Sequence, residues 1–171
     1  MDFKASKDMT VKIITIGVFL LFAFISYKSI IGIIHSSGRL TPILIHSSVL
    51  LFMVGILLFS YLYAPKEYSV DKHSLVIHRP VSNKIIPIDS IIEIRQVDKS
   101  ELKGTIRTFG VGGLFGNYGK FYTPALGNLT FYATQNKNYV LITMNKKKIL
   151  LTPDDLGIIQ EIKDIKNKLR Y

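Results

Sequence analysis

The sequence predicts two transmembrane helices followed by an all-β domain that ends in one amphipathic helix. Three features support this order. The N-terminal third holds two long apolar runs, the chain from Lys66 onward alternates apolar and polar residues between turn signals, and the C-terminal segment carries an apolar stripe at helical spacing. The predicted divisions are a cytoplasmic N-terminal segment 1–12, membrane spans 13–34 and 43–64, and a soluble domain 66–171.

Residues 43–64 form the clearer of the two predicted spans. They include no charged side chain, and a helix of this length would extend roughly 33 Å, enough to cross a hydrocarbon core of about 30 Å. Pro42 suits the first helical position and Pro65 marks the end of the helix. Tyr61 and Tyr63 fall near that end, where aromatic rings favour the membrane interface.

Residues 13–34 form the other predicted span, which Lys28 interrupts. Lys28 stands roughly 9 Å from the end of this helix, so its ammonium group can extend to the interface. A functional alternative pairs Lys28 with His46 in a buried polar site, but the position near a helix end favours the first interpretation. A cleaved signal peptide is disfavoured because the run is too long and a second span follows directly.

The distribution of basic residues predicts the orientation of this helical hairpin. The short connection offers only Arg39, whereas several lysines flank the other ends of the spans: Lys4, Lys7, Lys12, Lys66 and Lys72. Because basic residues stay on the cytoplasmic side, both termini are expected in the cytoplasm, with the chain a multi-pass protein of the inner membrane.

Seven antiparallel strands are predicted in the domain that follows. Alternating apolar and polar residues mark them, and short turns separate most neighbours, as Asn136-Lys137 does for the fifth and sixth. The predicted strands are 67–71, 74–79, 83–88, 91–97, 128–134, 138–144 and 147–151.

The last predicted element is a helix that begins at Thr152-Pro153. Thr152 is a suitable N-cap and Pro153 a suitable first residue. Ile158, Ile162 and Ile165 then fall on one face, which we expect to cover an open end of the sheet.

A run rich in glycine and aromatic residues separates the fourth and fifth strands. Residues 107–121 read RTFGVGGLFGNYGKF, followed by Leu126-Gly127 and by FYAT at 131–134. This run resembles the bacterial PH-domain family found behind two membrane spans, and the resemblance covers residues 68–162. It implies a PH-like bent barrel of about seven antiparallel strands with a C-terminal helix. The resemblance implies this fold but not a function, and the family has no assigned enzymatic activity and no settled ligand.

The same run supplies the candidate binding loop. Its rings offer contact area and its glycines allow close backbone approach, although large rings are usually buried and most of these are expected to fill the domain interior. It does not match a dinucleotide-binding fingerprint, because a phenylalanine stands where the third glycine is required. The candidate binding residues are Arg107, Phe109, Gly110, Gly112, Gly113, Phe115, Gly116, Tyr118, Phe121 and Tyr122.

A second candidate is the densest charge run, formed by Lys146, Lys147 and Lys148. It could contact an anionic membrane surface, but a solvated hairpin tip is the favoured interpretation. The domain from Lys66 onward carries 17 Lys and Arg against 10 Asp and Glu, a net +7. Because these charges are dispersed, a nucleic-acid partner is disfavoured.

Several kinds of chemistry are not expected. The chain has no cysteine, which excludes disulfides, thiolate metal sites and thiol nucleophiles. No catalytic residues, metal ligands or cofactor are predicted. The leading hypothesis is a membrane-anchored binding or scaffolding module with a protein partner. The alternatives are a sensor of anionic lipid or of the membrane surface, and a structural subunit of a membrane assembly, which could be oligomeric.

Overall fold

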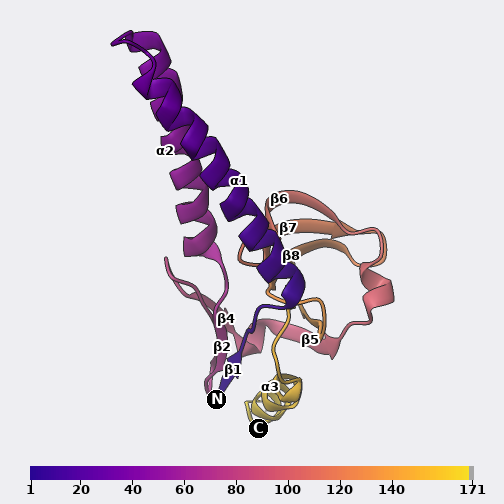
Figure 1. Cartoon of the computed structure of the whole chain (residues 1–171). Coiled ribbons are helices and arrows are strands. Elements are labelled where there is room, and N and C mark those ends of the chain that lie inside the picture. The colour runs from indigo at the N-terminus through magenta and orange to yellow at the C-terminus, as the bar shows by residue number, and fades with distance from the viewer. Residues whose placement is uncertain (170–171) are drawn as a thin grey trace.

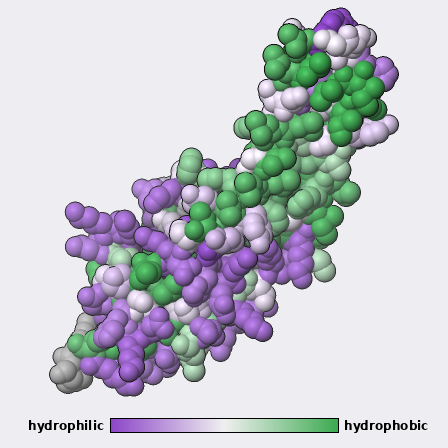
Figure 2. Space-filling model, turned by 90° about the vertical axis from the view of Figure 1, so that its left-hand side faces the viewer, coloured by the Kyte–Doolittle hydropathy of each residue, from purple (hydrophilic) through white to green (hydrophobic). Residues whose placement is uncertain are grey.

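The computed structural model describes residues 1–169, in which two long helices rise from a β domain (Figure 1). The helices are α1, Met9–Ile34, and α2, Leu40–Tyr63. Both are long and apolar enough to cross a membrane, and only 6% and 11% of their most apolar windows are buried, unlike the core helix of a soluble protein. Apolar surface accordingly covers the helical pair, whereas hydrophilic surface dominates the domain (Figure 2).

The two helices approach closely near their connection. A Cβ atom at Gly32 would fall 2.2 Å from Nε2 of His46, so only glycine allows the imidazole to pack there. Lys28 lies over the ring of Phe24, with 5.9 Å between its ammonium and the ring centroid. Within residues 1–169 it makes no hydrogen bond with His46, so the structure gives no support to the buried polar pair.

Sheet A contains four antiparallel strands in the order β1-β2-β3-β4. They are β1 (Asp2–Lys4), β2 (Glu67–Val70), β3 (Ser74–His78) and β4 (Lys84–Pro87). Strand β1 was not predicted, because three residues are too few to show an alternating pattern. Its pairing with β2 brings the N-terminus beside the domain, and the terminal amine donates to the Val70 carbonyl at 2.7 Å.

Sheet B contains six strands in the order β5-β9-β10-β8-β7-β6. They are β5 (Ile91–Gln96), β6 (Ile106–Gly112), β7 (Asn117–Thr123), β8 (Gly127–Ala133), β9 (Val140–Met144) and β10 (Lys148–Leu151). Neighbours are antiparallel except β8 and β10, which run parallel with Ile149 opposite Thr130.

The structure therefore corrects the predicted architecture in two respects. Residues 1–169 form ten strands in two sheets that do not close into a barrel, whereas seven antiparallel strands in a barrel were expected. Furthermore, Asn136-Lys137 does not join a hairpin, because β10 lies between β8 and β9. The short turn between β8 and β9 could not reveal that β10, which follows later in the chain, lies between these two strands in the sheet.

The predicted start of the C-terminal helix was also wrong. Helix α3 spans Gly157–Lys168, and Thr152 instead accepts a hydrogen bond from the backbone N–H of Thr134 at 2.9 Å. The N-cap of α3 is Leu156, and the Asp155 carboxylate beside it accepts from the N–H of Gly157 at 2.8 Å. Helix α3 packs on β5 and on β2, and its side chains Ile158 and Ile162 are fully buried.

Two apolar clusters lie on opposite faces of sheet B, because successive residues of its strands alternate between them. The inner core lies between the two sheets and α3 and includes Tyr68, Leu75, Ile77, Ile142, Leu151, Ile158 and Ile162. The outer cluster lies on the other face and consists of Val97, Phe121, Leu126, Leu129, Phe131, Ala133, Leu141 and Leu150. Partial cover comes from the segment after β5, which contains the 3-10 helix η2 (Lys99–Leu102).

Candidate functional site

The predicted binding loop is a β-hairpin formed by β6 and β7, and its tip reaches the helices. Gly113 adopts a φ of +96°, and a Cβ atom there would fall 2.7 Å from Cδ1 of Ile14 on α1. Gly110 faces Gly119 across the two strands, where a Cβ atom would fall 2.3 Å from the Tyr118 carbonyl oxygen. The glycines of this run thus allow close approach, but toward the chain's own helices and neighbouring strand.

Phe115 at the hairpin tip contacts both helices. Its ring meets those of Phe19 on α1 and Tyr61 on α2 edge-on, with centroid distances of 6.1 and 5.8 Å. Its backbone N–H donates to Oγ1 of Thr15 at 3.1 Å. The Lys7 ammonium lies 5.0 Å from the Phe115 ring centroid, and burial, followed by repulsion from Lys66, lowers the pKa of Lys7. Phe115 therefore joins the hairpin to both helices.

Tyr118 makes a second connection to α2. Its hydroxyl donates to the carbonyl of Ser60, which lies in the last turn of the helix, where carbonyl groups lack helical partners. Both side chains are buried, and burial raises the pKa of Tyr118 well above its usual value.

The start of α1 is tied to sheet B as well. The Asp8 carboxylate caps α1 by accepting from the N–H of Val11 at 2.8 Å, and it also accepts from the N–H of Asn136 at 2.9 Å. The Asp8 N–H donates to the Thr134 carbonyl at 3.2 Å. The domain is therefore attached to the first turn of one helix and to the last turn of the other.

The remaining hairpin side chains divide by exposure. Phe121 is buried and stacks on Phe131 of β8 with 4.2 Å between ring centroids. Phe109, in contrast, is 72% exposed, and Arg107 and Tyr122 are also exposed. The structure thus packs some rings of the candidate set inside the molecule and leaves others on its surface.

Strand β6 is an edge of sheet B, since it pairs only with β7. Exposed apolar edge strands are templates for association with another chain. Near its end, β6 lies beside α2, where Phe109 and Val111 face Phe52 and Phe59 across an open cavity of about 480 Å³.

The lysine run forms the turn between β9 and β10. Lys146 and Lys147 are exposed, while the Lys148 ammonium donates to the Leu126 carbonyl at 2.8 Å. Leu126 belongs to the turn that precedes β8, whereas Thr134 at the other end of β8 meets the start of α1. The lysines thus lie at the strand ends away from that junction, and their contact with a membrane surface stays a prediction.

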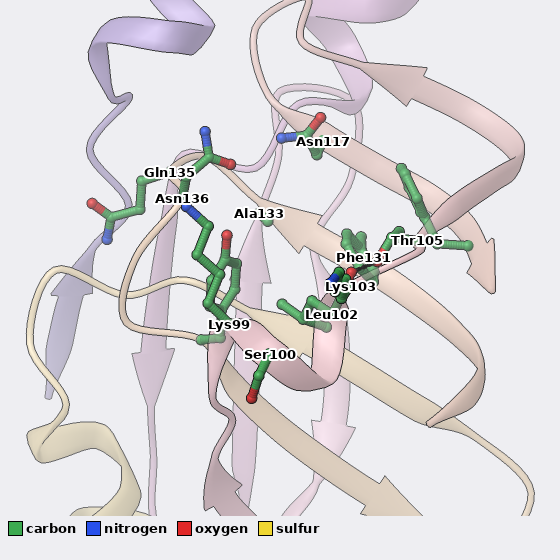
Figure 3. Close-up of a pocket in the computed structure, with 12 residues that line it drawn as sticks. Lys99, Ser100, Leu102, Lys103, Thr105, Asn117, Phe131, Ala133, Gln135 and Asn136 are labelled. Carbon is green, nitrogen blue, oxygen red and sulfur yellow. Dashed lines mark hydrogen bonds between the residues drawn. The ribbon is translucent and has the colours of Figure 1, made fainter. Parts of the chain in front are cut away.

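One cavity was not predicted from the sequence. It has a volume of about 600 Å³ and lies on the outer face of sheet B, between the η2 segment and strands β7 and β8 (Figure 3). Lys99 and Lys103 come from that segment, Phe121 and Phe131 from the strands. These residues share no sequence motif, and only the folded sheet brings them together.

A possible nucleophile–base pair occurs on sheet A. The Ser69 hydroxyl lies 2.7 Å from Nε2 of His78 on the neighbouring strand. No carboxylate orients this histidine within residues 1–169, so the pair lacks the third member of a hydrolase triad. A search of the same residues finds no group of three His, Cys, Asp or Glu side chains that could hold a metal ion.

Comparison with protein families explains the arrangement of the domain. The model of the Bacterial PH domain matches residues 66–166, which span β2 to β10 and most of α3. Comparison with the curated proteins and with the solved structures returns no match. A PH domain is typically a binding module. The chain belongs to the Bacterial PH domain family, with two apolar helices preceding the domain.

Proposed function

We propose that the chain is a membrane-anchored binding module that captures a protein partner at the inner membrane surface. In this proposal α1 and α2 span the membrane, both termini are cytoplasmic, and the exposed edge of β6 receives the partner. One observation carries it: the β6–β7 hairpin is fastened to both helices at its tip, yet Arg107, Phe109 and Tyr122 remain exposed.

Helix lengths support a position of the domain directly against the bilayer. Ser60 lies twenty residues after Leu40, roughly 30 Å along α2, and Thr15 lies roughly 29 Å along α1 from Ile34. A hydrocarbon core is about 30 Å thick, so both attachment points of the hairpin would fall at its inner boundary. The domain would then lie directly against the bilayer without a flexible stalk, and the end of β6, which faces Phe52 and Phe59, would reach past this boundary.

The composition of the β6 surface supports a protein partner. An exposed ring beside an arginine is typical of binding hot spots, and an edge strand can add an extended segment through its free backbone groups. Ile106, 62% exposed, extends the apolar surface away from the helices.

The second candidate function is a sensor of anionic lipid. It is favoured by the domain charge of +7 and by the position of Phe109 beside α2, close to the proposed hydrocarbon boundary. Anionic leaflets attract basic segments, and this attraction fades within about 8 Å at physiological salt.

A photo-crosslinking amino acid at position 109 would separate the two functions. We expect a discrete protein adduct in native membranes, absent when the crosslinker replaces Ile85, which is also exposed, to 60%, but lies on β4 of sheet A. An Arg107→Ala change in the same protein should weaken the adduct. Adducts with lipid alone would support the sensor, and equal protein adducts at both positions would refute a specific surface on β6.

Thiol labelling would test the orientation independently. The native chain has no cysteine, so Ser37→Cys and Lys146→Cys each provide one exposed label. An impermeant reagent should modify position 37 in intact cells and position 146 only after lysis. The reverse pattern would place the domain outside.

A further inference from the structure

The cavity on the outer face of sheet B has the size and shape of a small-molecule site. Its volume of about 600 Å³ lies within the roughly 300–1,000 Å³ typical of ligand pockets. It is open to the surface on one side, between the η2 segment and the strands (Figure 3).

The floor of this cavity is apolar and well packed. Phe121 and Phe131 stack there, and both are only 6% exposed. Ala133 of β8 and Leu102 of η2 continue the same surface. Because these side chains belong to the outer cluster, which no second sheet covers, an apolar group placed in the cavity would complete their burial.

The rim of the cavity is cationic. Lys99 and Lys103 are the charged side chains among its lining residues, and neither makes a side-chain hydrogen bond or ion pair in the described part of the chain. The neighbouring acids are already engaged: Asp98 caps η2, and Glu101 accepts two hydrogen bonds from Arg95 at 2.9 and 2.7 Å. The two ammonium groups therefore remain available to an anion.

The cavity also lies close to the start of α1. Asn136 contributes to its wall and donates its backbone N–H to Asp8, the residue that caps α1. Asp8 precedes Thr15 by seven residues, roughly 10 Å along the helix, and Thr15 marks the proposed inner boundary of the hydrocarbon. A molecule leaving the inner leaflet could reach the cavity over that distance.

We propose that this cavity binds an amphipathic anion, a single acyl chain with a carboxylate or phosphate head. The chain lies on the Phe121–Phe131 floor and the head meets Lys99 and Lys103. The site is separate from the surface around Phe109 and Tyr122, because Tyr122 and Lys120, the partner of Phe109, flank Phe121 on β7 and face the other side of sheet B. Arg107 lies opposite Phe121 and shares its side of the sheet. Only the delivery of the ligand from the bilayer rests on the proposed function.

The test uses the full chain in nanodiscs with a photoactivatable palmitate as the probe. Adducts should map to the η2 segment or to β7 and β8, and excess palmitate or lysophosphatidate should displace the probe, whereas methyl palmitate should not. The stronger of the two displacing anions identifies the head group. Equal displacement by the neutral ester, or adducts confined to the helices, would overturn the proposal.

Two variants provide matched controls. Lys99→Gln/Lys103→Gln should weaken binding by about tenfold or more, because charge-assisted contacts are the strong ones in such sites. Lys163→Gln/Lys168→Gln removes the same charge from exposed positions of α3 and should leave binding unchanged. Ser100 is exposed at the rim of the cavity. A Ser100→Trp change should therefore block the opening without disturbing a buried contact. Equal effects of both double variants, or none from Ser100→Trp, would refute the site.

The source of the ligand is tested separately. Probe added from solution should label the cavity whatever the orientation of the helices. Probe first incorporated in the nanodisc lipid should label it only if the chain is anchored as proposed. Labelling from solution alone would keep the site and refute the membrane delivery, whereas absence of labelling by both routes would refute the site itself.

Discussion

The inner core and the outer cluster are built from the same kinds of residue on the two faces of one sheet, yet they differ in what covers them. Sheet A and α3 enclose the inner core, and Leu151 and Ile158 there are completely buried. The outer cluster is covered only by the segment around η2, and a cavity opens beside that segment. An enclosed apolar face mainly stabilises the fold, whereas a partly covered one can also receive a ligand.

Polar groups follow the same division. The Tyr68 hydroxyl in the inner core donates to the Tyr132 carbonyl at 2.5 Å and accepts from the N–H of Thr152 at 3.4 Å, while burial raises its pKa well above normal. At the outer cluster, the lysines of the cavity rim have no such partners among residues 1–169. Buried polar groups need partners, and only an open site can leave charged ones unpaired.

The largest predicted effect comes from two adjacent leucines of β10. Leu151 faces the inner core and Leu150 the outer cluster, so Leu→Ala at each makes the same chemical change on opposite faces. Leu→Ala in a core costs about 2–5 kcal/mol, and the cost rises with the cavity that remains. Both leucines are completely buried, so the difference depends on how far the surroundings can close the space that is left. We expect Leu151→Ala near the upper limit and Leu150→Ala, beneath the η2 segment, near the lower, as measured by urea unfolding of the full chain in detergent. Equal costs would mean that the η2 segment encloses the outer cluster as well as sheet A encloses the inner core.

Two tyrosines provide an intermediate test. Tyr68→Phe should cost about 1–3 kcal/mol, because it leaves the Tyr132 carbonyl and the Thr152 N–H without their partner in the inner core. Tyr118→Phe removes one hydrogen bond, to the Ser60 carbonyl, and should cost about 0.5–1.5 kcal/mol. Hydrogen exchange should become faster throughout the domain in Tyr68→Phe. In Tyr118→Phe it should become faster only at the end of α2. A global effect of Tyr118→Phe would show that domain and helices unfold as one unit.

The pattern of short apolar runs between turn signals allowed most of sheet A and four strands of sheet B, namely β5, β8, β9 and β10, to be predicted. It did not identify β6 and β7, whose glycines weaken the strand pattern, so residues 106–123 looked like a loop. The C-terminal helix was predicted too early, because Thr152-Pro153 has the composition of a helix start while Thr152 actually bonds to the end of β8. The Thr152 hydroxyl accepts from the backbone N–H of Thr134, eighteen residues earlier, and no local sequence pattern reveals such a contact.

The candidate site shows the same limit. The sequence singled out the residues of the β6–β7 hairpin as unusual, but it could not assign Phe121 and Phe109 to different surroundings. That assignment depends on which strand becomes the edge of sheet B and on where the helices meet the hairpin tip. The lysines of the cavity were not noticed at all, because Lys99 and Lys103 acquire their relation to Phe131 only when β8 folds beneath η2.

The smallest predicted effect concerns the segment that covers the outer cluster. Arg95 holds Glu101 of η2 through two hydrogen bonds, and these, together with the Asp98 N–H, lower the pKa of Glu101 to about 2. Because this pKa lies below the usual value of about 4.3, the interaction stabilises the segment above that pH and weakens as the pH falls toward 2. Glu101→Gln should therefore speed hydrogen exchange of residues 98–105 near neutral pH.

The difference in exchange rate between Glu101→Gln and the native chain should disappear by about pH 2, where the native Glu101 carboxyl becomes protonated. The effect should be small because the pair is partly exposed to solvent and screened by it. Glu161→Gln on α3 is the control, since Glu161 has no hydrogen bond or ion pair within residues 1–169, and it should leave exchange of this segment unchanged at every pH. If Glu101→Gln and the native chain exchange alike near neutral pH, the ion pair does not hold η2 over the outer cluster, and the cover must depend on Leu102 and Tyr139, which pack against that cluster.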